Sequence, residues 1–398
     1  MRYLKLLILF LLIVLTNCNN QNKKGNITDT NINPEIRKYI NFLQNQNILA
    51  KDYVLSLFEK YDIVIISERL HYEYTQYEFY LDIISDKRFI NNVGNVFVEV
   101  GVSSEQDNVE RFLKSENLTE NEIEKNALEI YRNIPFLPSW DKTSYYDFLI
   151  RIYKINQDLE PSKKINLYYS DVPFSWKYTK NKEQYKIFMD TISTRDSIIA
   201  KQIIDKFEKS EIKTNNHKKA LLILNYRHGF TNIRYTKDGG KAENTGRYLK
   251  EKYKNRIASV LINDLCPKDD TFFSYQNGKW DVSFELLNKT NIGFDFNKSP
   301  FGNDSFDMYP VANDLTYNNV FTGFIYTSPI DSFIFRKGVK NYISNDFKSE
   351  YLRRMEIGGY LPDIENDTIQ RLWKYNNKEW CPNYDTIKFE INKWKNTL

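Results

Sequence analysis

The residues of this chain best suited to chemistry stand where apolar runs end. The run at 62–66 leads directly into the sequence "SERLH", which contains Glu68 and His71. If these two residues share one face of a helical turn, the carboxylate can orient the imidazole and raise its basicity. Imidazole titrates near neutral pH, so His71 is a candidate general base for a water molecule. The alternative is that Glu68 is only a favourable first-turn acid and that His71 caps or packs on the helix.

Three more apolar runs have polar residues at or near their ends. Glu99 stands in "FVEVG", Asp171 ends "INLYYSD", and "ALLILN" is followed by Tyr226, Arg227 and His228. Two of the three histidines in the chain therefore follow such runs. In an open parallel sheet, ligands bind beyond the carboxyl ends of the strands. We therefore predict that these polar groups meet at one edge of a sheet.

Glu99 requires a partner in this scheme. It lies between Val98 and Val100 in a run that should be buried on both faces, and an unpaired buried carboxylate is costly. His71 or Arg195 would serve as that partner. Arg195 could also steady an oxyanion or a substrate carboxylate, or it could be only a solvated helix charge. His228 could act as an acid or polarise a carbonyl group.

A divalent metal is the competing use of the same atoms. Glu68, His71, Glu99 and His228 could together hold Zn²⁺, Mn²⁺ or Fe²⁺. The sequence contains no HExxH motif and no second ExxH motif, so two familiar metal arrangements are absent. It also lacks GxSxG, a P-loop and a GxGxxG after the first run. We therefore predict no cofactor, with a metal-dependent site as the alternative.

The order of the apolar runs predicts an α/β fold. Runs at 62–67, 95–100, 165–171, 220–225 and 257–262, and a weaker one at 321–327, alternate with helical patterns. Such runs are typical of a mostly parallel central sheet flanked by helices. Residues 104–160 predict a helical excursion after the second strand, and 181–212 predict one long helix. We expect one domain over 34–398, less regular after 268, with loops and short strands over 268–320.

The N-terminus has the pattern of an export signal. Arg2 and Lys5 flank the apolar run at 6–15, which is too short to span a bilayer and ends in "LTNC". We predict a signal peptide over 1–17, lipidation of Cys18, and a solvated tether over 18–33. The chain would then be a bacterial lipoprotein held on a membrane, facing the periplasm or the cell surface. The alternative is a secreted protein with an incidental cysteine.

The net charge and the other two cysteines give less information about function. The formal charge is +4 over 398 residues and no block of Lys and Arg occurs, so nucleic acid is not an expected partner. Cys266 and Cys381 could form a disulfide in an exported protein or could be buried small residues. The sequence does not predict the oligomeric state.

These motifs, in this order, resemble the erythromycin esterase-like family. That family's first strand ends in Gly-Glu-x-x-His, similar to "SERLH", where Ser67 replaces the glycine. Its second strand carries a Glu and its third ends in an Asp, matched by Glu99 and Asp171. Its long helix carries Arg-Asp, matched by Arg195 and Asp196. Its fourth strand ends in a His-Asn-x-His-like motif, similar to "LNYRH", which supplies Asn225 and His228 without the first His.

The resemblance covers about residues 35–265 and implies hydrolysis of a small-molecule ester or lactone by water. His71 would activate the water, Glu68 and Glu99 would orient groups and balance charge, and His228 and Arg195 would stabilise the oxyanion. Asp171, Asp196, Asn225 and Arg227 would support these groups or bind substrate. Two alternatives stay open: a metal-dependent hydrolase or peptidase of the same fold, and a non-catalytic lipoprotein that binds heme or another ligand.

Overall fold

The computed structural model describes residues 32–138, 140, 143–210, 218–232, 234–235, 242–268, 271–308, 315–335, 338–359 and 384–396. Cys18 and Cys381, and with them the predicted lipidation and disulfide, lie outside these residues. Within the described ranges, every helix is too short or too polar to span a lipid bilayer.

The centre of the molecule is a seven-stranded, mostly parallel sheet with the order β10-β11-β7-β1-β4-β2-β3. All neighbouring pairs are parallel except β10 and β11, which are antiparallel. The predicted α/β class is therefore correct. The strands are β1 (Ile63–Glu68), β2 (Asn95–Val102), β3 (Asn166–Asp171), β4 (Ala220–Asn225), β7 (Ile257–Ile262), β10 (Ile292–Asp295) and β11 (Gly323–Tyr326).

Helices cover both faces of this sheet, as the continuous apolar runs predict. Val64 and Ile66 of β1 pack under one helical layer, and Ile63 and Ile65 pack under the other. The first layer contains α3 (Ala50–Leu57), α4 (Thr75–Ile84), α6 (Gln106–Lys114), α7 (Glu120–Asn133) and α8 (Thr143–Gln157). The second contains α10 (Arg195–Lys209) and α11 (Thr245–Tyr253).

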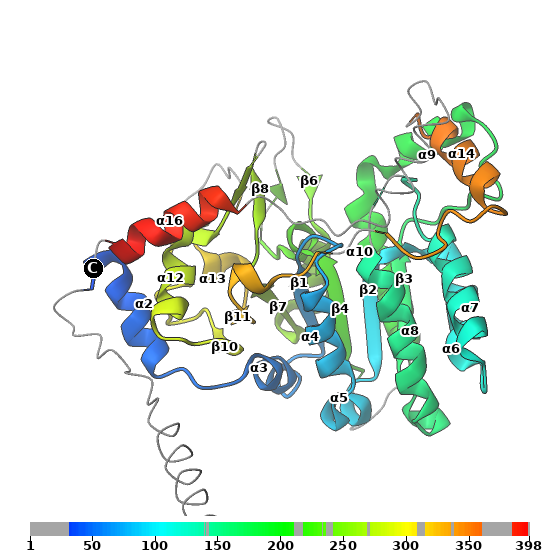
Figure 1. Cartoon of the computed structure of the whole chain (residues 1–398). Helices are drawn as coiled ribbons and strands as arrows, with labels where there is room; N and C mark the ends of the chain where they lie inside the picture. The colour runs from blue at the N-terminus through cyan, green and yellow to red at the C-terminus, as the bar shows by residue number, and fades with distance from the viewer. Residues whose placement is uncertain are drawn as a thin grey trace, which may run out of the picture.

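The remaining elements lie mainly at the two ends of the sheet. Figure 1 shows α2 (Pro34–Gln44), α12 (Lys279–Leu286) and α16 (Asp385–Asn396) gathered at the β10 end, and α9 (Lys182–Thr191) beside α14 (Lys348–Ile357) at the other end. The smaller elements are α5 (Lys87–Asn92), α13 (Tyr317–Val320), and the short pairs β5 (Arg234–Tyr235) with β6 (Ala242–Glu243) and β8 (Cys266–Lys268) with β9 (Thr271–Phe273). The helix α12 stands where the sequence predicted loops and short strands.

The region 181–212, predicted as one helix, contains two. A 3₁₀ turn, η4 (Ile192–Thr194), separates α9 from α10. Around it Thr191, Ser193 and Thr194 each donate a side-chain hydrogen bond to the carbonyl three residues earlier. Such bonds compete with helical pairing and bend the chain. The break makes Arg195 the first residue of α10, at the carboxyl edge of the sheet.

The segment 68–94 contains two helices, α4 and α5. Glu68 is the last residue of β1, and α4 begins only at Thr75. The Glu73 carboxylate accepts the backbone N–H groups of Thr75 and Gln76 at 2.8 and 2.9 Å, which fixes the helix start there. His71 therefore lies in a turn before the helix and not on a helical turn, although it still meets Glu68.

Candidate functional site

The sheet brings together the polar residues that lie at or near the ends of the predicted strands. The strands β1, β4, β2 and β3 are neighbours and run parallel, so their carboxyl ends share one edge. His71 Nδ1 lies 3.0 Å from Glu68 Oε2. His228 Nε2 lies 3.2 Å from Glu99 Oε1. One oxygen or nitrogen atom from each of Glu68, His71 and Glu99 lies within 4.8 Å of the others.

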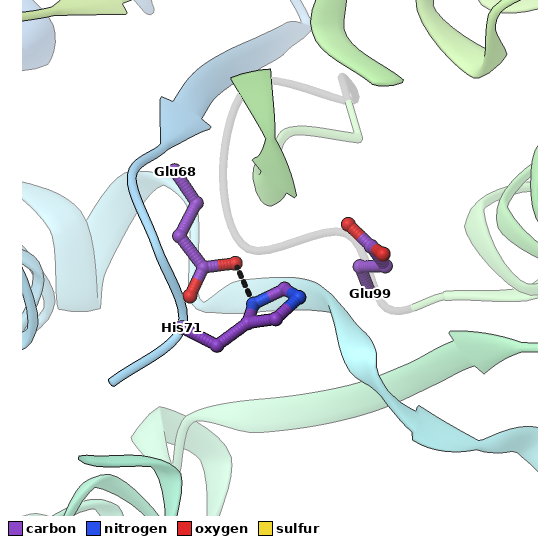
Figure 2. A group of neighbouring side chains, drawn as sticks. All are labelled: Glu68, His71 and Glu99. Atoms are coloured by element: carbon purple, nitrogen blue, oxygen red, sulfur yellow. Dashed lines mark hydrogen bonds and ion pairs between the residues drawn. The ribbon is translucent and has the colours of Figure 1, made fainter. Parts of the chain in front are cut away.

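Figure 2 shows how this group is arranged. The imidazole of His71 lies between the two carboxylates, with Nδ1 bonded to Glu68 and the other ring nitrogen on the side of Glu99. A water that forms hydrogen bonds of ordinary length to two atoms joins atoms about 4.6 Å apart. One imidazole nitrogen and one Glu99 carboxylate oxygen lie no more than 4.8 Å apart, within the reach of one bridging water.

The Glu68–His71 pair is fixed from two sides by residues that the sequence analysis missed. The hydroxyl of Tyr77 on α4 donates to Glu68 Oε1 at 2.5 Å. Burial, together with the Glu68 charge, holds the pKa of Tyr77 well above its usual value, so the phenol keeps its proton. Trp140, between α7 and α8, meets the His71 ring edge-on at 4.9 Å between centroids. The one sequence signal that could have pointed to Tyr77 is its position on the helix that follows β1, nine residues after Glu68.

A bulge in β2 aims Glu99 into this edge. The register of β2 against β3 shifts between Val98 and Val102, and such bulges redirect side chains beside functional sites. Gly101 within the bulge has φ +135°, and a Cβ there would lie 2.6 Å from the Tyr169 ring. Glu99 then accepts the backbone N–H of Asn225 at 2.9 Å through Oε2.

Arg195 is the cation that Glu99 was predicted to need. Its Nη2 donates to Glu99 Oε1 at 2.8 Å, and its Nε and Nη2 form a bidentate pair with Asp171 at 2.8 and 2.9 Å. The guanidinium also lies 5.3 Å from the Trp140 ring centroid. Burial raises the pKa of Glu99, but His228 and Arg195 outweigh it and keep that pKa well below the usual range. The alternative of a solvated helix charge for Arg195 is therefore wrong.

His228 is held on its other side by Asp196. It lies in the 3₁₀ turn η5 (Tyr226–Gly229), and its Nδ1 is 2.6 Å from Asp196 Oδ1. Asp196 also accepts the N–H and the hydroxyl of Thr245 at 2.8 and 2.9 Å. Burial would lower the pKa of His228, but Glu99 and Asp196 more than offset it and raise that pKa above the ordinary value.

Three nitrogen atoms converge beside Glu99. Nη1 of Arg195 and Nη2 of Arg227 lie 3.3 and 3.2 Å from His228 Nε2. This cationic group suits a developing negative charge. It does not suit a metal ion, because two guanidinium groups lie against the nitrogen that would ligate. The candidate metal group thus contains Glu68, His71 and Glu99, and His228 does not fit as its fourth ligand.

Ser67, the residue at which the chain departs from the resembled motif, faces away from the reacting groups. Its side chain is fully buried. A Cβ built on Gly229 would lie 2.7 Å from the Ser67 hydroxyl oxygen, so the hydroxyl occupies space under η5 that only glycine leaves open. The Ser67 substitution therefore alters packing below the turn that carries His228.

The link between His228 and Asp196 gives a pH-dependent prediction. Because the pKa of His228 is raised, its charge stabilises the fold fully below the unfolded value of about 6.5 and this contribution is lost as pH rises through the folded value. Asp196→Asn removes one of the two anions and should lower the pKa of His228. Histidine-selective NMR titration measures this change, since the chain has only three histidines. An unchanged titration would show that Asp196 does not act on the imidazole.

Comparison with known proteins gives a distant likeness of fold. No protein-family model and no curated protein matches the chain. A protein from Bacillus cereus of known crystal structure aligns with a TM-score of 0.42 and 11% identity over 73% of this chain and 96% of its own. An erythromycin esterase mutant, EreC, in its open conformation aligns with a TM-score of 0.45 and 10% identity over 68% of this chain and 91% of its own. The type III effector HopBA1 aligns with a TM-score of 0.33 and 12% identity over 62% of this chain and 94% of its own.

Proposed function

We propose that this protein hydrolyses an ester or lactone of a small molecule, using a water activated by His71. The observation that carries the proposal is the arrangement of Glu68, His71 and Glu99 at one strand edge, with Glu68 bonded to Nδ1 of the imidazole. A carboxylate on Nδ1 favours the tautomer whose Nε2 accepts a proton. His71 is 9% exposed and both glutamates are 1% exposed, so the base is the member of the group that solvent reaches most easily.

The same edge of the sheet also carries groups that would stabilise the charge formed on the substrate. When water attacks a carbonyl carbon, negative charge develops on the carbonyl oxygen. The convergent nitrogen atoms of Arg195, Arg227 and His228 would receive that charge in a largely buried setting, where such interactions are strong. Asp171 and Asp196 hold Arg195 and His228 in place. Asn225 fixes the Glu99 carboxylate through its backbone N–H.

The first test is turnover by the full-length protein after treatment with a chelator. We expect hydrolysis of chromogenic esters and lactones to survive chelation, because the proposed base and oxyanion groups are all side chains of the chain itself. Elemental analysis of the protein used in the assay accompanies the measurement. If a folded, chelator-treated protein hydrolyses no ester or lactone in the panel, the proposal of a metal-independent hydrolase fails.

A metal-dependent hydrolase is the second candidate, favoured by the spacing within 4.8 Å of ligand atoms in Glu68, His71 and Glu99. Carboxylate and imidazole ligands suit Zn²⁺, Mn²⁺ or Fe²⁺. Such an ion would polarise the substrate or lower the pKa of a bound water. A stoichiometric metal in the purified protein, with activity lost on chelation and restored by that metal, would favour this candidate.

We also propose that the chain is an exported lipoprotein, on the basis of the short apolar run and the "LTNC" sequence that ends with Cys18. Metabolic labelling with a radioactive fatty acid should mark the wild-type protein and should fail with Cys18→Ser. If both proteins incorporate the same label, Cys18 is not the attachment site.

A further inference from the structure

A cavity lies along the outer edge of the sheet, away from the Glu68–His71 group. It has a volume of about 600 Å³ and is bordered by α6, the end of α8, the first residues of β3 and the C-terminal half of α10. β3 is the last strand of the sheet on this side. The end of β3 that carries Asp171 belongs to the proposed active site, whereas Asn166, Leu167 and Tyr168 line this cavity.

The exposed edge of β3 is already capped by side chains. Gln106 donates through Nε2 to the Leu167 carbonyl at 3.0 Å and accepts the Tyr169 N–H through Oε1 at 2.9 Å. The Lys206 ammonium donates to the Tyr169 carbonyl. An extended peptide that added itself as a strand would need these same backbone groups. Strand addition at this edge is therefore blocked, and the cavity suits a small molecule instead.

The charge of the cavity is positive. Four lysines and two glutamates line it. Lys114 and Lys164 have carboxylates nearby, at 3.6 Å from Glu110 and 3.5 Å from Glu116. Lys206 differs, because among the described residues its ammonium has neutral oxygen acceptors, from Tyr169 and Gln106, and no carboxylate within ion-pair distance. Burial lowers the pKa of Lys206 to about 8, with Glu110 and Asp107 acting in the opposite direction.

We propose that this cavity binds a small anionic molecule, with a carboxylate or phosphate group on Lys206 and an apolar body against the apolar part of the lining. That part comes from Leu113, Ile165 and Leu167 on one face of the sheet and from the Tyr168 ring on the other. The Tyr168 ring is stacked on Phe97 at 4.5 Å between centroids, which holds it in place. An anion would supply the charge partner that Lys206 lacks, and such charge-assisted contacts are among the stronger hydrogen bonds.

The test is titration calorimetry of the full-length protein with benzoate and with phenylphosphonate as probes. Inorganic phosphate shows whether the anionic group alone suffices, and benzyl alcohol is the neutral control. Lys206→Met keeps the apolar stem but removes the charge, and should weaken binding about tenfold or more, the effect of losing one charged hydrogen bond. Lys201→Met is the matched control, since Lys201 is exposed on the same helix and should bind the probes like the wild type.

A second measurement uses only the wild-type protein. Benzoate keeps its charge across neutral and basic pH, so its binding should follow the charge of Lys206. Affinity should be full below pH 8 and fall as pH rises above it, with proton uptake on binding near that value. Absence of binding by both anionic probes, equal binding to Lys206→Met, equal binding of benzyl alcohol, or affinity independent of pH would each overturn the proposal. None of these outcomes depends on ester hydrolysis.

Discussion

His71→Ala is expected to lower kcat/KM for ester hydrolysis by about 10²–10⁴-fold, the usual contribution of a general base. The imidazole is held at 3.0 Å from Glu68, which Tyr77 holds in turn at 2.5 Å. No other described imidazole replaces it, because His228 is bound by Asp196 and lies against two guanidinium groups. The measurement is steady-state turnover of the best ester in the panel.

The fold should survive this change, since His71 lies in a turn outside the helices and strands and is more exposed than Glu68 and Glu99. Circular dichroism and the urea midpoint check that point. His217→Ala is the matched control, because His217 follows none of the predicted strands, and it should keep wild-type activity. Full activity in folded His71→Ala protein would remove His71 as the base.

Arg195→Met is expected to destabilise the protein by about 3–5 kcal/mol, the typical effect of removing one partner of a buried ion pair. The substitution leaves Asp171 without its cation and leaves Glu99 with His228 alone, and Asp171 and Glu99 are 0% and 1% exposed. The wild-type and variant free energies of unfolding are obtained from urea denaturation. Methionine keeps an unbranched apolar stem, whereas the guanidinium contacts with the Phe136 and Trp140 rings, at 5.4 and 5.3 Å, are lost together with the charge.

The control for this measurement is Arg88→Met. Arg88 forms ion pairs with Asp52 and Asp86 at similar distances, but its side chain is 52% exposed. Exposed pairs contribute about 0–1 kcal/mol. If Arg195→Met lowers the free energy of unfolding no more than Arg88→Met does, the buried ion pairs of Arg195 do not hold the site together.

Much of the site followed from local sequence alone. Glu68, Glu99, Asp171 and His228 lie near the ends of apolar runs, and parallel strands in neighbouring positions bring their carboxyl ends together. The partner of Glu99 was predictable in kind, since a buried carboxylate requires a cation. Arg195 was one of two named candidates, and the structure adds His228 as a second partner.

Other parts required three-dimensional information. The break between α9 and α10 depends on three side-chain bonds to local carbonyls, and hydrophobic periodicity does not report such bonds. Trp140 reaches His71 from the helical excursion, 69 positions later in the chain, through tertiary packing. The strand β10 is short and pairs antiparallel at the sheet end, where four residues give little periodic signal.

The most direct test of the account is a single turnover in ¹⁸O-labelled water with enzyme in excess, followed by mass spectrometry of product and protein. Because two carboxylates flank the base within 4.8 Å, attack by a glutamate instead of water is the alternative to exclude. Direct attack by an activated water predicts one ¹⁸O atom in the acid formed in the first turnover and no acyl adduct on the protein. An unlabelled first product with the label left in a glutamate, or an acyl adduct on any residue, would contradict the account.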